Sequence, residues 1–351
     1  MNSKPLRVLV TAAGGDFGQA IIKALRFCEE PIELHGCDLS DTGIGGAFVD
    51  SYHVVPAAKN QANYVRRLDR LCRDFSIDAV VPASEAEIAV LGGLNSYPKL
   101  QCGTAIVCQH TSWVETYGDK LNCMRALEEK VALAAYADGG DREAVNKLIE
   151  RVGFPVVVKS RRSRGSRSLH IVDSRTQLEK KIKETGWPLV QQFIDSTGGE
   201  FSVGVYACLG FRSAIIFKRQ LGVIGCSWFA ETSDDSEVRE YAETIAGSID
   251  LKGSANIQVR KGADGVRLLE INTRFSSLVA ARAFCGFRDA EWSVLAALGR
   301  SVGWPEGGFK QIRFRRFIHE LIDDGEGFHA VPLWQPRLFL TEGKEGAEHH
   351  G

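Results

Sequence analysis

The chain has 351 residues, of which 44% are hydrophobic and 25% are charged, and this length predicts two or three globular domains. Its 43 basic residues are balanced by 44 acidic ones, so it lacks the positive field typical of nucleic-acid binding, and we expect no nucleic-acid partner. The nine cysteines are dispersed and form no CxxC pair, which predicts reduced thiols in a cytoplasmic protein. No apolar run approaches the roughly 20 residues of a membrane span, so we expect no membrane partner.

The first third of the chain alternates strands with helices. An apolar strand at 6–10 is followed by a glycine-bearing turn, and then Ile21, Ile22 and Leu25 recur at helical spacing. The same patterns predict further strands and helices, namely strand 32–40, helix 64–75, a strand, loop and helix over 77–94, and strand 105–108. Such alternation favours an open parallel sheet.

The glycine turn itself allows two interpretations. Gly14, Gly15 and Gly18 resemble a dinucleotide fingerprint, and Asp38 lies about 20 residues further on, where a ribose-binding acid would stand. A glycine-rich turn is also the simplest connection between a buried strand and a helix. We expect a structural or substrate-facing turn, which makes a dinucleotide-dependent oxidoreductase the weakest functional alternative.

From about residue 110 the pattern changes. Helical spacing, apolar alternation and turn residues predict a different series of elements. These are helices 119–137 and 142–153, a strand, loop and strand over 154–172, helix 176–185, strands 188–195, 200–210 and 212–222, helix 236–249, a hairpin over 253–275, and a largely helical remainder to about 325.

Positive charge is concentrated in the loop of the segment VVVKSRRSRGSRSLHIV, residues 156–172. Lys159 ends an apolar strand, and four arginines alternate with serine and glycine behind it. Small residues let backbone N–H groups approach phosphate oxygens, and arginines add charge-assisted donors. The segment therefore predicts a lid over a polyphosphate, with a solvated basic turn as the structural alternative.

Hard oxygen ligands are grouped in the segment RLLEINTRF, residues 267–275. Glu270 and Asn272 are two residues apart on one strand, so their side chains share a face, and Arg274 can follow them. If the hairpin tip is centred near Asp264, Gln258 lies opposite Glu270. Carboxylate and amide oxygens on one face predict a Mg²⁺ site.

A third group of polar residues surrounds the end of the strand at 188–192. Gln191 and Gln192 end this strand, and Glu200 follows a glycine-rich turn. An extended segment there can offer backbone groups to an adenine edge, while Glu200 accepts from ribose hydroxyls.

The order of these motifs resembles the ATP-grasp superfamily, and most closely its carbamoyl-phosphate-synthetase-like carboxylate–amine ligase branch. GDK at 118–120 is similar to the family's first lysine motif, and 156–172 to its second lysine and phosphate-covering loop. VQQFIDSTGGEFSV at 190–203 resembles the hinge and ribose acid, and ANIQV with LLEINTRF resembles the metal motif. The resemblance covers about 110–300, and residues 1–109 resemble the family's preceding Rossmann-like domain.

The fold that this resemblance implies is α/β, an α+β ATP-grasp module of two lobes behind an N-terminal Rossmann-like parallel-sheet domain. Four segments are expected. They are the Rossmann-like domain at 1–109, the small lobe with the phosphate-covering loop at 110–192, the large lobe with the metal site at 193–325, and a C-terminal extension or tail at 326–351.

The resemblance also implies residue roles. ATP would be bound by Lys120, Lys159, Arg164, Gly165, Ser166, Gln192, Phe193, Ile194 and Glu200. Mg²⁺, with Mn²⁺ as an alternative, would be held by Gln258, Glu270 and Asn272. Transferred phosphate or the substrate carboxylate would face Arg274, Lys218 and Arg219. Gln191 departs from the family, which commonly has an acid at that position of the hinge.

The activity implied is ATP-dependent ligation of a small carboxylate, such as an amino acid, to an amine through an acyl-phosphate, with release of ADP and phosphate. The partners are then these two small molecules, together with a second copy of the chain if it forms a homodimer. Two alternatives stay open, an ADP-forming small-molecule kinase and a nucleotide-binding regulator without catalysis.

Overall fold

The computed structural model describes residues 4–41, 43–94, 99–162, 169–208, 210–222, 225–303, 307–318, 321–323 and 328–330. The chain forms two compact units, residues 1–316 and 317–351. In the second unit, β16 (Leu321–Asp323) pairs antiparallel with β17 (Phe328–Ala330). Within the described residues no helix has the length and apolarity to cross a membrane. The four-segment division expected from the sequence is finer than these two units and stays a prediction.

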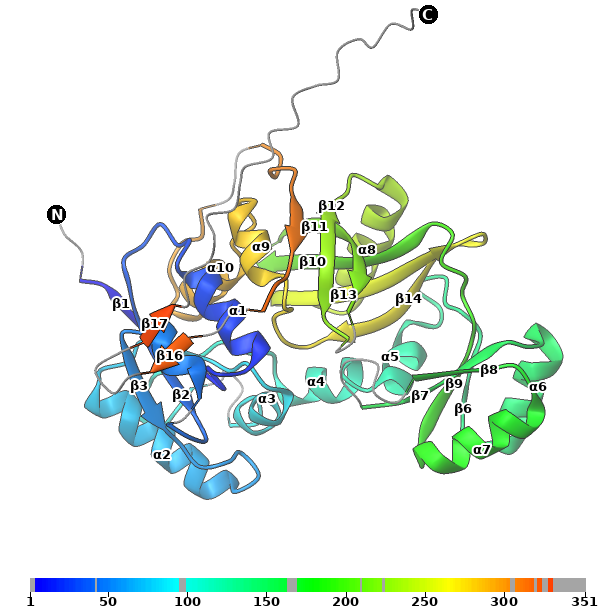
Figure 1. The fold of residues 1–351 in the computed structure, drawn as a ribbon, viewed down its shortest axis with the longest axis horizontal. Helices are drawn as coiled ribbons and strands as arrows, with labels where there is room; N and C mark the ends of the chain where they lie inside the picture. The colour runs from blue at the N-terminus through cyan, green and yellow to red at the C-terminus, as the bar shows by residue number, and fades with distance from the viewer. Residues whose placement is uncertain are drawn as a thin grey trace, which may run out of the picture. The chain divides into compact units, whose positions relative to one another are not determined.

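The N-terminal part of the first unit is a five-stranded parallel sheet, as predicted, in the order β3-β2-β1-β4-β5 (Figure 1). Val8 and Val10 of its central strand pack toward α1, and Leu9 packs toward α2 on the opposite face. Both faces are covered, which explains the apolar run Val8–Val10 in β1. The elements are β1 (Leu6–Thr11), α1 (Asp16–Leu25), β2 (Ile32–Asp38), the 3₁₀ helix η1 (Ile44–Phe48), β3 (Ser51–Val54), α2 (Gln61–Asp74), β4 (Ala79–Val81), α3 (Glu85–Leu91) and β5 (Ala105–Ile106).

A four-stranded antiparallel sheet follows, in the order β6-β9-β7-β8. Its helices α6 and α7 pack on one face, around Val145, Leu148, Val156 and Leu178 (Figure 1). The two helices linking it to the N-terminal sheet are α4 (Thr111–Tyr117) and α5 (Lys120–Leu127). The elements of this part are β6 (Tyr136–Asp138), α6 (Arg142–Val152), β7 (Val156–Ser160), β8 (Leu169–Val172), α7 (Arg175–Thr185) and β9 (Pro188–Gln192).

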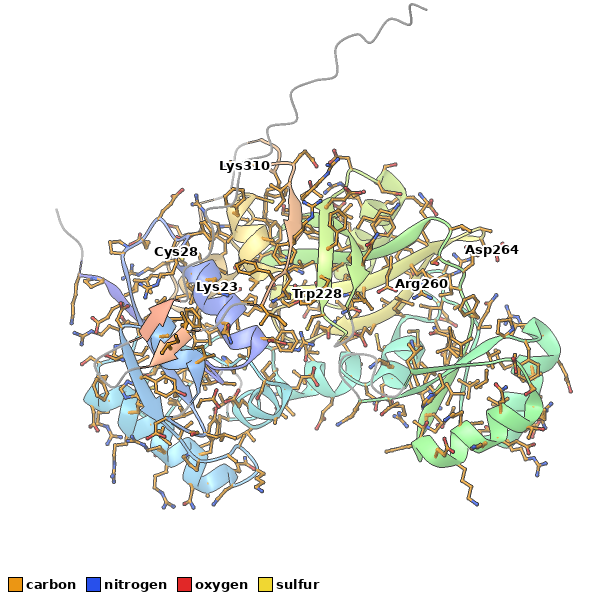
Figure 2. The ribbon with its side chains drawn as sticks, viewed as in Figure 1. Lys23, Cys28, Trp228, Arg260, Asp264 and Lys310 are labelled. Atoms are coloured by element: carbon orange, nitrogen blue, oxygen red, sulfur yellow. The ribbon has the colours of Figure 1, made fainter. Side chains whose placement is uncertain are left out.

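The largest sheet has six antiparallel strands in the order β14-β13-β10-β11-β12-β15. Asp264 lies at the tip of the β13–β14 hairpin (Figure 2), and Gln258 is the cross-strand partner of Glu270, as predicted. The register is not uniform, because a β-bulge between Val259 and Gln258 leaves Leu269 unpaired. The elements are β10 (Gly199–Cys208), β11 (Phe211–Leu221), β12 (Ser227–Thr232), α8 (Ser236–Ser248), β13 (Gly253–Gly262), β14 (Gly265–Asn272), α9 (Val279–Phe284), α10 (Asp289–Ala297) and β15 (Arg313–Arg315).

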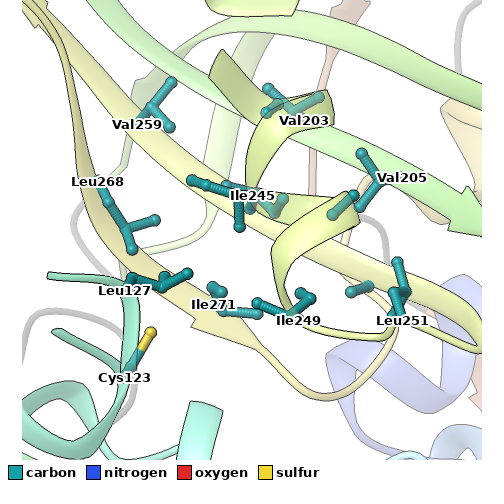
Figure 3. Close-up of a cluster of buried hydrophobic side chains, with 14 of the residues drawn as sticks. Cys123, Leu127, Val203, Val205, Ile245, Ile249, Leu251, Val259, Leu268 and Ile271 are labelled. Carbon is teal, nitrogen blue, oxygen red and sulfur yellow. The ribbon is translucent and has the colours of Figure 1, made fainter. Parts of the chain in front are cut away.

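The core of this sheet lies under α8. Ile245 and Ile249 of the helix face Val203, Val205 and other strand side chains, as Figure 3 shows. Cys123 and Leu127 of α5 join the same cluster, which anchors α5 to the sheet. Burial of this apolar face stabilises the fold by about 25 cal/mol per Å². It thereby fixes the strands that carry the polar residues of the site.

Two predicted elements were wrong in part. The helix expected over 119–137 ends at Leu127, because Tyr136 and Ala137 pair with β9 as a strand. The segment after the hairpin contains α9 and α10 but then forms β15, which extends the large sheet at its edge. The strands β3 and β12 were not predicted. The α/β class itself is confirmed.

Candidate active site

A cavity of about 440 Å³ is lined by strands of the four-stranded and six-stranded sheets and by the start of α1. Its wall includes β7, the end of β9, the start of β10, the middle of β13, and Gly15–Phe17 at the start of α1. Most of the residues predicted for the site line this cavity. They are Lys120, Lys159, Gln192, Phe193, Ile194, Glu200, Arg219, Gln258, Glu270 and Arg274.

The other predicted residues are not in this wall. Lys218 is exposed, because adjacent residues of β11 point to opposite faces and Arg219 takes the face toward the cavity. Asn272 is buried beside the wall, and its Nδ2 donates to Glu270 Oε1 at 3.3 Å. Arg164, Gly165 and Ser166 lie outside the described residues, as do Ser163, Arg167 and Ser168.

Two lysines and one glutamate form the charged centre of the cavity. Lys120 Nζ lies 3.0 Å from Glu270 Oε2, and Lys159 Nζ donates to the carbonyl oxygen of Leu269 at 3.0 Å. Burial, reinforced by the neighbouring Lys120 charge, lowers the pKa of Lys159 to about 7. Burial opposes ionisation of Glu270, but Lys120 and Lys159 outweigh it and lower the pKa of this carboxyl group. The cavity therefore holds an ionised carboxylate beside a lysine that titrates near neutral pH.

Asp119 fixes the position of Lys120, and the sequence analysis missed this role. Its carboxylate caps α5 by accepting from Leu121 N and Asn122 N, and it also accepts from Arg161 Nε at 3.0 Å. Burial acts against ionisation, but Arg161 holds the pKa of Asp119 below its usual range. An Asp before a helix is a common N-cap, which is the signal that could have identified it. The end of β7 and the start of α5 are thus joined through one carboxylate.

Glu200 lies between two arginines on neighbouring strands. Its cross-strand partners are Arg219 on β11 and Arg260 on β13, and the side chains meet at 2.7 Å and 2.6 Å. Although burial acts in the opposite direction, these two charges lower the pKa of Glu200. Arg219 Nη2 also donates to Gln258 Oε1 at 2.6 Å, and Arg260 Nη1 donates to the carbonyl oxygen of Ile194 at 3.2 Å.

Arg260 was missed by the sequence analysis. Figure 2 shows it on the part of β13 that lies toward the four-stranded sheet. Strand alternation places it on the same face as Gln258, two residues away, and that spacing is the signal that could have identified it.

The glycine turn of the N-terminal sheet forms the remaining wall. Gly15–Phe17 line the cavity, and the guanidinium carbon of Arg274 lies 3.5 Å from the centre of the Phe17 ring. Asp38, the alternative ribose acid, accepts from Gly14 N at 2.9 Å and so holds the turn itself. The turn therefore contributes to the same cavity as the lysines and Glu270.

Comparisons with known proteins agree with this geometry. Residues 189–316 match a family model described as ATP-grasp in the biosynthetic pathway with Ter operon. An ADP complex of N5-carboxyaminoimidazole ribonucleotide synthetase superposes with a TM-score of 0.69 at 14% identity, over 89% of this chain and 81% of that one. The chain has the ATP-grasp fold. This confirms the resemblance stated from the motifs.

Other solved structures share this ATP-grasp fold. Biotin carboxylase from Campylobacter jejuni, in a β-γ-ATP complex, has a TM-score of 0.69 at 14% identity, covering 85% of this chain and 72% of its own. An L-amino acid ligase from Bacillus licheniformis has a TM-score of 0.62 at 14% identity, covering 84% and 75%. No curated protein sequence matches the chain.

The ATP-grasp cavity of this chain is rich in charge. Among the described residues, three acidic side chains line it, Asp16, Glu200 and Glu270, beside a larger cationic set. The cationic residues are Lys120, Lys159, Arg219, Arg260 and Arg274. An excess of positive charge in a partly enclosed, low-dielectric cavity suits a polyanionic ligand.

Proposed function

We propose that the chain is an ADP-forming, ATP-dependent ligase that joins a small carboxylate to an amine through an acyl-phosphate. The observation that carries this proposal is the combination, in one cavity, of two buried lysines with an ionised Glu270 that is held by Lys120. Structurally similar proteins that were solved as ADP complexes support the nucleotide. All nine cysteines are free thiols, which supports a reducing compartment such as the cytoplasm.

ATP binding follows from the cationic wall and the hinge. Lys120 and Lys159 contact phosphate oxygens. Gln192–Ile194 frame the adenine, and Glu200 accepts hydrogen bonds from the ribose. Arg219 and Arg260 hold Glu200 ionised and in place, so the ribose meets a fixed acceptor.

The residues present fit a hard divalent cation. Glu270 is ionised, and the Gln258 and Asn272 side chains add amide oxygens from the same face of the hairpin. Lys120 contacts a carboxylate oxygen of Glu270, and Arg219 contacts the amide oxygen of Gln258. A bound triphosphate would offer Lys120 and Arg219 other anionic partners and so free these two oxygens for the metal. Mg²⁺, or Mn²⁺ in its place, would neutralise charge on the phosphate that is transferred.

The reaction then requires little covalent work from the chain. A substrate carboxylate oxygen attacks the γ-phosphorus, the bond to the β-phosphate oxygen breaks, and ADP leaves; the amine then displaces phosphate from the acyl-phosphate. Arg274 and Arg219 stabilise the charge on the transferred group and position the carboxylate. Exposed Lys218 takes no step in this scheme.

Product analysis tests the proposal. The protein is incubated with Mg²⁺-ATP and pooled carboxylates, with and without pooled amines, and ADP, phosphate and new amides are measured. ADP formed only when both pools are present supports the ligase. ADP formed without amines, together with a stable phosphorylated product, would instead identify a kinase. Failure to bind ATP in a direct titration would refute the nucleotide site.

A further inference from the structure

A row of three side chains crosses the four-stranded sheet on its cavity face. Gln191 of β9 pairs with Val157 of β7, which in turn pairs with Ile171 of β8. Val156 and Val190, which adjoin this row along the strands, pack under α6 and α7, so strand alternation turns the row to the opposite face. All three residues of the row line the cavity, and Gln191 is its one polar member.

The apolar part of the row is incompletely covered. Ile171 is 57% exposed although the adjacent Val172 is buried, and Leu169, two residues before Ile171 on the same face, is 42% exposed. Leu169 also lines the cavity. Apolar strand side chains that open to a cavity favour a flat apolar ligand, because its binding removes their surface from water. A heteroaromatic base offers such a face, and its polar edge requires hydrogen-bonding partners beside the apolar surface.

Gln191 has a hydrogen-bonding group that the sheet does not use. Its side chain is only 2% exposed, and its Nε2 has no hydrogen-bond partner among the residues that the structure describes. The next residue shows the contrast, because Gln192 Oε1 accepts from Ala135 N at 3.2 Å and so joins β9 to the chain beside it. A buried amide donor without a partner is unfavourable. The amide of Gln191 is therefore suited to a ligand in the cavity.

A carboxamide can complement either of two purine edges. It carries a donor and an acceptor side by side, and rotation of the group by half a turn exchanges them with almost no change of shape. Adenine presents a donor at its 6-amino group and an acceptor at N1, whereas guanine and hypoxanthine present an acceptor at O6 and a donor at N1. A carboxylate has acceptors alone, so it would pair with the 6-amino group and repel O6.

We propose that Gln191 binds the position-6 edge of the nucleotide base and lets the site accept 6-oxopurine nucleotides as well as ATP. This inference rests on the nucleotide site of the proposed function and defines its base specificity. The phosphates and the ribose are assigned to other residues, namely Lys120, Lys159 and Glu200. A change at Gln191 should therefore alter the preference between bases and leave those contacts in place.

The first test compares two nucleotides with the wild-type protein. ITP differs from ATP only at position 6 and at the N1 proton of the base, so it reports on this edge alone. The Kd of each Mg²⁺-nucleotide is measured by calorimetric titration. We expect the Kd of ITP to lie within about tenfold of the Kd of ATP, since both edges find a donor and an acceptor. A Kd of ITP that exceeds this limit overturns the inference.

The second test replaces the amide with a carboxylate of the same shape. In Gln191→Glu, at pH 8, we expect the Kd of ITP to rise about tenfold to a hundredfold relative to that of ATP, because O6 then faces an acceptor. The matched control is Gln177→Glu, the same change at an exposed residue of α7 (Arg175–Thr185) that does not line the cavity. Its Oε1 accepts from Asp173 N, which a carboxylate also does, so neither Kd should change.

A third variant, Gln191→Met, keeps the length of the side chain but removes the donor and the acceptor. Binding of both nucleotides should weaken by similar factors, so their ratio stays close to that of the wild-type protein. If Gln191→Glu does not fold, as judged by thermal denaturation, Gln191→Met decides the question. Unchanged Kd values for both nucleotides in that variant would refute a contact between Gln191 and the base.

These results separate the inference from the proposed function. Tight binding of ATP with exclusion of ITP by the wild-type protein keeps the nucleotide site and the ligase, and refutes the role of Gln191. An unchanged ratio of the two Kd values in a folded Gln191→Glu protein refutes that role too. Absence of binding of either nucleotide refutes the nucleotide site and, with it, this inference.

Discussion

The cavity has two walls that are built in different ways. On the six-stranded sheet, Glu200, Arg219 and Arg260 are cross-strand neighbours, so strand register alone brings them together and their charges compensate one another. On the other wall, Asp16 and Phe17 are the first residues of α1, directly after the glycine turn, and their partners Cys226 and Arg274 are more than 200 positions away in sequence. The charges on the sheet wall compensate one another within one sheet, whereas the contacts of Asp16 and Phe17 depend on tertiary packing.

The sheet wall is also supported from behind. Arg282 and Asp289 are both fully buried, and Arg282 Nη1 lies 3.1 Å from Asp289 Oδ2. Arg282 Nη2 donates to Asn256 Oδ1, which also accepts from Ser202 Oγ at 2.8 Å. Asn256 and Ser202 line the cavity, so the buried ion pair fixes the side chains that form its surface.

The largest expected effect is on stability, from breaking this buried pair. Arg282→Met leaves Asp289 buried without its cation, and we expect the free energy of unfolding to fall by about 3–5 kcal/mol. Urea denaturation measures the change. If the comparison of the walls is right, Asp16→Asn on the turn wall should cost less than about 1 kcal/mol by the same assay.

The double variant Arg282→Met/Asp289→Leu is the control for this prediction. It removes both charges, so most of the stability lost in the single variant should return. If the single variant is as stable as the wild-type protein, the pair does not support the wall.

The next largest effect is on turnover. Glu270→Gln removes the carboxylate that holds Lys120 and, by our proposal, the cation, and Lys159→Ala removes a phosphate contact. Each should lower the rate of ADP formation about 10²–10³-fold, equivalent to roughly 2.7–4 kcal/mol, by analogy with the loss of one oxyanion-hole donor.

Single-turnover ADP formation at saturating Mg²⁺-ATP is the measurement for both variants. Glu231→Gln is the matched control, because Glu231 lies on β12 of the same sheet, paired with Arg313, and is not among the residues that line the cavity. Near-normal turnover in both Glu270→Gln and Lys159→Ala would refute the proposal that these residues bind the metal and the phosphates.

The difference between the walls also explains what the sequence could predict. Gln258 was expected opposite Glu270 from a hairpin centred near Asp264. The structure has this pairing, but the tip pairs Gly262 with Gly265, and a β-bulge that leaves Leu269 unpaired shifts the register to bring Gln258 opposite Glu270. Glu270 and Asn272 were expected on one face because strand side chains alternate, and they are hydrogen-bonded. The shared face of Glu270 and Asn272 needed only local geometry, whereas the pairing of Gln258 with Glu270 also depends on the bulge.

Residues whose position depends on tertiary packing were not predicted. The glycine turn was expected to be structural or to face the substrate, but neither Asp16 nor Phe17 could be assigned, because their place depends on how the N-terminal sheet packs against α9 and α10. The helix expected over 119–137 was wrong beyond Leu127 for a related reason. Pairing of Tyr136 with Gln191 outweighs the helical preference of an alanine-rich segment.

The smallest expected effect is the uptake of a proton by Lys159 when ATP binds. With its pKa lowered to about 7, folded Lys159 binds fewer protons between pH 7 and 10.5 than the unfolded chain, so its contribution to stability rises with pH across that window. A bound triphosphate favours the charged lysine and raises its pKa again.

At pH 8 we therefore expect ATP binding to take up about one proton, and ATP affinity to fall as pH rises above 7. Calorimetric titration in buffers of different ionisation enthalpy measures this uptake. Lys159→Arg should abolish it, because arginine stays protonated, whereas Asp16→Asn on the turn wall should leave it intact. Uptake that persists in Lys159→Arg would place the titrating group elsewhere in the cavity.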